Sequence, residues 1–115
     1  MRLFKKITYL IDENMRISEK DVKSFTKSIV INSGEIFPEG TSDEHLTKIS
    51  AEKGWVIVTK DIRMALRSLQ ENVPVIYVND EFKTTSFLNV SLYGASKYPE
   101  MFAYAEKKYG YSHKK

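Results

Sequence analysis

The chain contains no cysteine, and this absence removes several kinds of chemistry. A disulfide framework, a thiol nucleophile and a cysteine-based zinc site are all excluded. Long apolar runs are also missing, since no stretch approaches the roughly 18 apolar residues of a membrane span. The charged start has no long apolar stretch behind it and does not resemble a signal peptide. We therefore expect a soluble, cytoplasmic protein that makes no contact with a membrane.

Internal repeats, low-complexity stretches and linkers are absent as well, so residues 1–115 are expected to form a single domain. With 42% hydrophobic residues the chain can bury a small core. Its net charge of +3 permits nucleic-acid binding without requiring it. The basic residues gather in groups, and for each group a solvated surface is the alternative explanation. These groups are Lys20, Lys23 and Lys27; Arg63 and Arg67; and Lys107, Lys108, Lys114 and Lys115.

Short apolar runs alternate with helical patterns along the first two thirds of the chain. The runs predict strands at 6–11, 28–31, 55–58 and 75–78. Capping signals and apolar spacing predict helices from Ser18 to about Lys27, over 41–53 and from Asp61 to about Asn72, with a loop at 35–40. This alternation is typical of a three-layer α/β/α fold with a four-stranded, mostly parallel sheet. Right-handed crossovers favour the strand order 2-1-3-4.

The last part of the chain, 81–115, is predicted to be helical. Apolar positions indicate a helix over 84–93, and Pro99 stands at the first turn of a final helix. Tyrosines are frequent here, and two uses remain open for them: a stacking or partner surface, or completion of the core and a homodimer contact. These tyrosines are Tyr93, Tyr98, Tyr104, Tyr109 and Tyr111.

Acidic residues follow the predicted strands. Asp12 ends the first strand, and Asp61 follows the third. In the order 2-1-3-4 these strands are neighbours, so the two carboxylates face each other across the crevice where open α/β sheets bind ligands. Helix capping is the alternative explanation for Asp61, whereas no helical pattern directly follows Asp12. The pair Asp43-Glu44 begins the intervening helix, and Asp80 ends the fourth strand.

Carboxylates that converge on one point repel each other, so such a cluster generally persists because a cation compensates it. With no cysteine and only two histidines, the candidate ligands are oxygen atoms, which suit Mg²⁺ or Mn²⁺ better than zinc. We expect Asp12 and Asp61 to hold the ion. Either Asp43 or Glu44 is expected to join them, and Asp80 is a candidate outer ligand.

Three segments resemble, in their order and spacing, the motifs of the small PIN-like family. The resemblance covers residues 6 to 80 and implies an α/β/α fold with a parallel sheet. It also implies a Mg²⁺- or Mn²⁺-dependent ribonuclease activity, which in some members belongs to a toxin paired with an antitoxin. By this resemblance Asp12 and Asp61 are the principal metal ligands, Asp43 is the third acidic position and Glu44 is an alternative. The segments are Leu10-Ile11-Asp12-Glu13-Asn14, Thr41-Ser42-Asp43-Glu44-His45-Leu46 and Val56-Ile57-Val58-Thr59-Lys60-Asp61.

The expected reaction is hydrolysis of a phosphodiester bond in RNA. A divalent ion would activate a water molecule, and Lys60, Arg63 and Arg67 beside Asp61 would hold the flanking phosphates. For the two arginines, the polar face of an amphipathic helix is an equally good explanation.

The chain departs from the family pattern at two places. Met15-Arg16 follows the first motif where Leu-Pro is frequent, and Arg63-Met64 replaces a second acid with Phe. The missing acid leaves a reduced cluster, so a PIN-like module that binds RNA or a protein partner without cleavage is the second hypothesis. A receiver-like phosphoacceptor domain is a third, but the fourth strand follows Asp61 too soon and ends at Asn79, where Ser or Thr would be needed.

Overall fold

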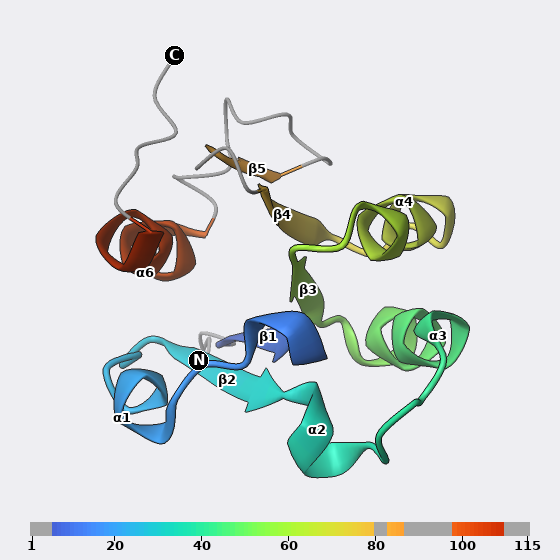
Figure 1. Cartoon of the computed structure of the whole chain (residues 1–115), viewed down its shortest axis with the longest axis horizontal. Helices are drawn as coiled ribbons and strands as arrows, with labels where there is room; N and C mark the ends of the chain where they lie inside the picture. The colour runs from blue at the N-terminus through green and yellow to red at the C-terminus, as the bar shows by residue number, and fades with distance from the viewer. Residues whose placement is uncertain (1–5, 80–82, 87–97, 110–115) are drawn as a thin grey trace, which may run out of the picture.

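A computed structural model of the chain describes residues 6–79, 83–86 and 98–109 (Figure 1). Its centre is one sheet in the order β2-β1-β3-β4-β5. The first four strands are parallel and have the predicted order, and β5 pairs antiparallel with β4. In chain order the strands are β1 (Ile7–Ile11), β2 (Ser28–Asn32), β3 (Val56–Thr59), β4 (Val75–Asn79) and β5 (Lys83–Ser86).

Strand β5 corrects the prediction of a helix beginning at residue 84. Thr84 and Thr85 pair with Val78 and Tyr77 of β4. Two successive β-branched residues favour a strand. The remainder of that predicted helix lies outside the described residues.

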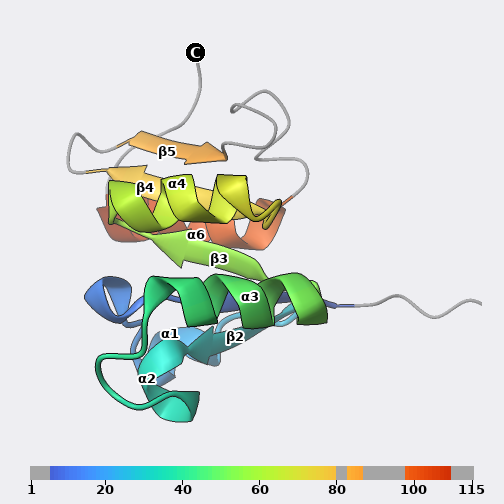
Figure 2. The same ribbon diagram turned by 90° about the vertical axis from the view of Figure 1, so that its right-hand side faces the viewer.

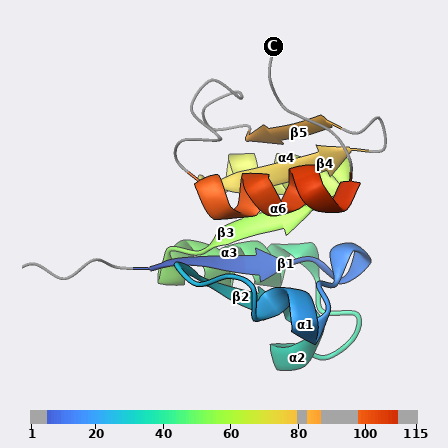
Figure 3. The ribbon, with the colours of Figure 1, turned by 90° about the vertical axis from the view of Figure 1, so that its left-hand side faces the viewer.

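Helices cover both faces of the sheet, as predicted. α3 and α4 pack on one face, and α1 and α6 lie on the other (Figures 1, 2 and 3). The helices are α1 (Glu19–Val22), α2 (Ser33–Ile36), α3 (Asp43–Lys53), α4 (Ile62–Gln70) and α6 (Pro99–Tyr109), with a 3-10 turn η1 at Glu13–Met15.

Three of these elements differ locally from prediction. α1 is shorter, because the Ser24 hydroxyl donates to the backbone oxygen of Asp21 at 2.6 Å and competes with further helix. The first residues of the loop predicted at 35–40 belong to α2, a single helical turn. The Phe37 N–H donates to the Ser33 backbone oxygen and closes this turn. Thr41, with Glu44 three residues later, is the capping signal of the sequence for α3, but the cap is Ser42, since the Ser42 hydroxyl accepts from the His45 N–H.

Helix α4 presents a different face to the core than its apolar spacing predicts. The spacing of Ile62, Ala65, Leu66 and Leu69 predicts that these residues face the core, yet Ile62 and Leu66 are 43% and 48% exposed. Ala65 is buried and Leu69 packs against the core as predicted, and Met64 and Ser68 complete the buried face. Ser68 tolerates burial because its hydroxyl donates to the Met64 backbone oxygen at 2.8 Å. The helix is thus turned by about one residue position, or about 100°, from the predicted orientation.

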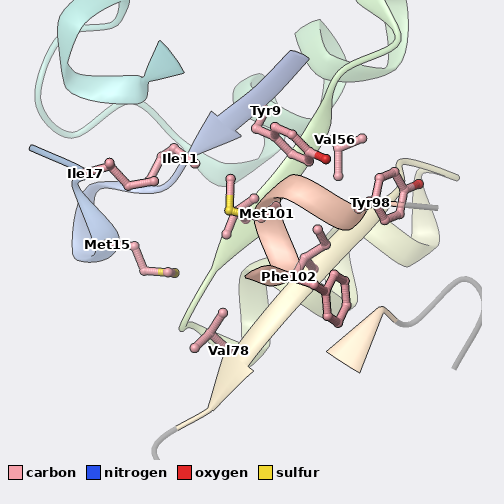
Figure 4. Close-up of a cluster of buried hydrophobic side chains, with 11 residues drawn as sticks. Tyr9, Ile11, Met15, Ile17, Val56, Val78, Tyr98, Met101 and Phe102 are labelled. Atoms are coloured by element: carbon pink, nitrogen blue, oxygen red, sulfur yellow. The ribbon is translucent and has the colours of Figure 1, made fainter. Parts of the chain in front are cut away.

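The core forms two layers, one on each face of the sheet. Side chains alternate along each strand, so Leu10 and Ile57 pack toward α3 and α4 while Tyr9 and Ile11 pack toward α6. Met101 and Phe102 of α6 insert into the second layer (Figure 4).

Two tyrosine side chains of the last third are described, and both pack on the core layer. Tyr98 is buried and packs edge-on against Tyr9, with ring centroids 6.1 Å apart, so it completes the core. Tyr104 is half-buried at the edge of the same layer. Tyr93, Tyr111 and the side chain of Tyr109 lie outside the description.

Glu100 fastens α6 to the start of β2. Its carboxylate accepts hydrogen bonds from the N–H groups of Thr26 and Lys27, at 2.7 and 3.1 Å, and from the Ser28 hydroxyl at 2.6 Å. Burial raises the pKa of this carboxyl, but the hydrogen bonds from Ser28, Thr26 and Lys27 outweigh burial and lower the pKa below its ordinary value.

Replacing Glu100 by Gln should therefore destabilise the protein at neutral pH. An amide presents an NH₂ group to donors, so we expect a loss of about 1–2 kcal/mol in the free energy of unfolding, at the lower end because Glu100 is partly exposed. The lowered pKa stabilises the fold above the ordinary pKa of glutamate, and this contribution disappears as the pH falls through the folded pKa. Urea titrations at neutral and acidic pH should show that the difference in the free energy of unfolding between wild type and Glu100→Gln becomes smaller in acid. Glu39→Gln, in an exposed loop, is the matched control, and an equal loss there would contradict the assignment.

Candidate functional site

The carboxyl ends of β1 and β3 place Asp12 and Asp61 at one edge of the sheet. Ile11 pairs with Val58 in the parallel ladder, and the Asp12 N–H extends it by donating to the Val58 oxygen at 2.9 Å. Both acids therefore follow neighbouring strands, where an α/β sheet opens its crevice.

Thr59 connects the two aspartates directly. Its hydroxyl donates to Asp12 Oδ2 at 2.6 Å and accepts from the Asp61 N–H at 2.9 Å. The residue is fully buried, which fixes the position of the hydroxyl. Sequence reasoning missed this role, although the signal was present: a threonine two residues before an aspartate can accept from that aspartate's N–H in a local turn.

Each aspartate also caps the element that follows it. Asp12 Oδ1 accepts from the Glu13 N–H at 2.8 Å and caps η1, so the expectation that Asp12 has nothing to cap is wrong. Asp61 Oδ1 accepts from the Arg63 N–H at 2.9 Å and caps α4. Capping and a functional role are compatible here, because each cap fixes one carboxylate oxygen and thereby orients the whole group.

Asp43, at the first position of α3, lies in the electric field of both aspartates. Burial raises the pKa of its carboxyl, and the negative charges of Asp12 and Asp61 raise it further. The positive charges of Arg63 and Arg67 act in the opposite direction. The carboxylates of three separate segments thus gather at one edge. Folding brings them there at an electrostatic cost that a bound cation would remove.

The other two candidate ligands are less directly connected. Glu44 is exposed, and within the described chain its side chain shares no hydrogen bond or ion pair with Asp12 or Asp61. Asp80 lies outside the described residues.

The donor set fits a divalent cation by type and charge, since all three groups offer hard carboxylate oxygens. Their positions fit less closely. Among residues 6–79, 83–86 and 98–109, no three His, Asp or Glu side chains are close enough together to hold a metal ion. The gathered carboxylates would have to move closer to each other to share one ion.

Basic residues border the carboxylates. The Arg63 side chain is 88% exposed, and its Nε lies 3.8 Å from Asp61 Oδ1. Arg67 is half-buried, and its positive charge acts to lower the pKa of Asp43. Lys60 is also half-buried, and its N–H faces Asn14 Oδ1 at 3.5 Å, a long contact between η1 and the loop after β3.

A small hollow of about 210 Å³ lies beside Asp12, between the ends of β1 and β2 and thus on the opposite side of β1 from β3 and Asp61. Asn32 forms a firm wall, because its amide exchanges two hydrogen bonds of 2.8 Å with the backbone of Ile17. Arg16 lines the hollow and forms an ion pair with Glu35 at 3.6 Å, both side chains being more than half exposed. Asp12 therefore stands between a hollow and the acidic edge.

A family model described as PIN like domain matches residues 8–82. No curated protein and no solved structure matches the chain.

In the part of the chain that the structure describes, no helix is long and apolar enough to cross a membrane.

Proposed function

The chain belongs to the PIN-like domain family, and from this premise we propose that it is a metal-dependent nuclease that hydrolyses phosphodiester bonds in RNA. The observation that carries the proposal is the meeting of Asp12, Asp43 and Asp61 at one sheet edge, where burial and then the charges of Asp12 and Asp61 raise the pKa of Asp43. Carboxylates that repel each other at an open edge are expected where a cation is to be bound.

In this proposal Asp12, Asp43 and Asp61 hold Mg²⁺ or Mn²⁺. The ion, when bound, supplies a water of lowered pKa and offsets negative charge on the leaving oxygen. Thr59 keeps the Asp12 carboxylate oriented through its 2.6 Å hydrogen bond. Lys60, Arg63 and Arg67 bind the phosphates on either side of the scissile bond, and the hollow beside Asp12 gives room for an adjoining nucleotide.

A second candidate function is RNA or protein-partner binding without cleavage. It is favoured by Arg63, which stands where the family pattern suggests another acid and lies 3.8 Å from Asp61. A guanidinium at this place competes with a cation for the same carboxylate. An antitoxin is one such partner, and cleavage assays decide between the two functions.

Thermal unfolding with and without Mn²⁺ tests the proposed metal site. A bound ion at a hundredfold excess over its Kd stabilises a protein by about 2.7 kcal/mol, so the wild-type Tm should rise by several degrees. Asp43→Asn should abolish this rise. In EDTA the same variant should be slightly more stable than wild type, by less than about 1 kcal/mol, because the raised pKa means that ionised Asp43 opposes folding at neutral pH.

Glu52→Gln removes one exposed acid from the same helix and should keep the full Mn²⁺ response. RNA cleavage measured in the same buffers should need Mn²⁺ or Mg²⁺ and stop with EDTA. A wild-type Tm indifferent to Mn²⁺ and Mg²⁺, together with cleavage that survives EDTA, would refute the metal site.

A further inference from the structure

A groove of about 560 Å³ separates α1 from α6, on the sheet face that α3 and α4 do not cover. Its volume lies within the range of about 300–1,000 Å³ that is common for ligand sites. One wall comes from α6, which lies outside the segment 8–82 that matches the PIN-like family. The groove is therefore a feature that the family match does not account for.

Lysines from two distant parts of the sequence meet in this groove. Lys20 comes from α1, and Lys107 and Lys108 come from the last turn of α6. All three are exposed. Each of these lysines stands in the last turn of its helix, where a cation is favourable, but that position alone does not explain why the three meet in one groove.

The acidic residues of the groove are already engaged by the protein itself. Glu100 accepts the hydrogen bonds that fasten α6 to β2. Asp21 accepts from the Tyr104 hydroxyl at 3.2 Å and lies 4.0 Å from Lys108 Nζ. Lys20 and Lys107 take part in no ion pair within the described ranges. The charge that the groove offers to a ligand is therefore positive.

An aromatic pair forms the floor beside these lysines. The rings of Phe25 and Tyr104 lie 5.4 Å apart between centroids at a tilt of 50°, and both residues are half-buried. Positive charge next to aromatic surface is the combination that binds single-stranded nucleic acid, in which phosphates alternate with planar bases. An acidic peptide would match the lysines but not the aromatic floor.

The groove runs toward the edge that carries Asp12. Glu100 holds one end of α6 at Ser28, the first residue of β2. Lys108, at the other end, reaches Asp21 in α1, the helix that follows η1 and the end of β1. Figure 3 shows α6 crossing the sheet with its last turn on the same side as the arrowhead of β1.

We propose that the α1–α6 groove binds a single-stranded segment of RNA next to the segment held at the acidic edge. The inference rests on RNA being the substrate, as in the proposed function. It adds a second contact region, which makes affinity depend on RNA length.

The test reverses two charges, Lys20→Glu with Lys107→Glu, and leaves the Asp21–Lys108 pair intact. Binding of a long single-stranded RNA is measured by fluorescence anisotropy in EDTA over a range of salt concentrations. We expect about tenfold weaker binding than wild type, and the slope of log affinity against log salt should fall by about 1.4, for two lost phosphate contacts. Cleavage of a dinucleotide substrate, too short to reach the groove, should keep its rate.

Lys48→Glu with Lys53→Glu, at exposed positions of α3, makes the same change in net charge on the other face of the sheet. An equal loss of RNA affinity in this control pair, or unchanged affinity in the groove pair, would overturn the proposal. So would tight binding of an acidic peptide, but not RNA, to the wild-type groove. Because RNA binding is measured without metal, it can be interpreted even if the protein does not cleave RNA. Absence of cleavage would count against the proposed function only.

Discussion

Asp12→Asn should reduce Mn²⁺-dependent RNA cleavage by about a thousandfold, which corresponds to about 4 kcal/mol of transition-state stabilisation. In the proposed site this residue carries a negative charge that the neutral amide cannot supply to a cation. The amide keeps the size of the side chain, and its oxygen can still accept from the Glu13 N–H. We therefore expect the fold to survive while activity is lost.

The measurement is initial-rate cleavage of a labelled RNA under saturating Mn²⁺, with a Tm recorded for each variant. Asp21→Asn is the matched control, since this acid lies on α1 and contacts Tyr104 and Lys108 rather than the acidic edge. It should cleave a short substrate at close to the wild-type rate. If the Asp12 variant retained wild-type cleavage while the metal remained necessary, the ion would have to sit elsewhere.

Phe102→Ala is expected to have the largest effect on stability, a loss of about 3–4 kcal/mol in the free energy of unfolding. The ring is 2% exposed and belongs to the layer that also contains Val58 and Val78. Truncation leaves a cavity between α6 and the sheet. For a domain with a free energy of unfolding of about 5–15 kcal/mol, such a loss is a large fraction of the total.

Urea denaturation followed by circular dichroism measures this loss. Ala103→Ser, the next residue on the same helix, is exposed and should change the free energy of unfolding by less than about 0.5 kcal/mol. A cost for Phe102→Ala no larger than that of the control would mean that α6 contributes little to the fold in solution.

The parallel part of the fold was predictable because its information is local. Strand β1 and helix α3 carry their signals within a few residues: an apolar run in the first case, a capping hydroxyl and Gly54 in the second. The rotation of α4 was not predictable in the same way. Ser68 tolerates burial because its hydroxyl is hydrogen-bonded within the helix, whereas a hydrophobicity pattern treats serine as a surface residue.

For the candidate site, strand order alone predicted that Asp12 and Asp61 follow adjacent strands. The hydrogen bond from Thr59 to Asp12 joins two strands that are far apart in sequence, so a linear pattern does not contain it. The cap at Asp12 and the contact between Thr59 and the Asp61 N–H are local, and their sequence signals were overlooked. Likewise, the lysines of α1 and α6 were visible as separate groups, but only the packing of the two helices brings Lys20 and Lys107 to one groove.

The link between Glu100 and the segment Thr26–Ser28 also has a consequence for the order of folding. The carboxylate and its donors are 72 to 74 residues apart in sequence, so this contact closes late by any route that begins with local structure. During synthesis the four parallel strands emerge before α6 does. Until that helix docks, the face that holds Tyr9 and Val56 lacks the cover that Met101 and Phe102 provide. Docking of α6 therefore completes the burial of this face, and it is a late step of folding.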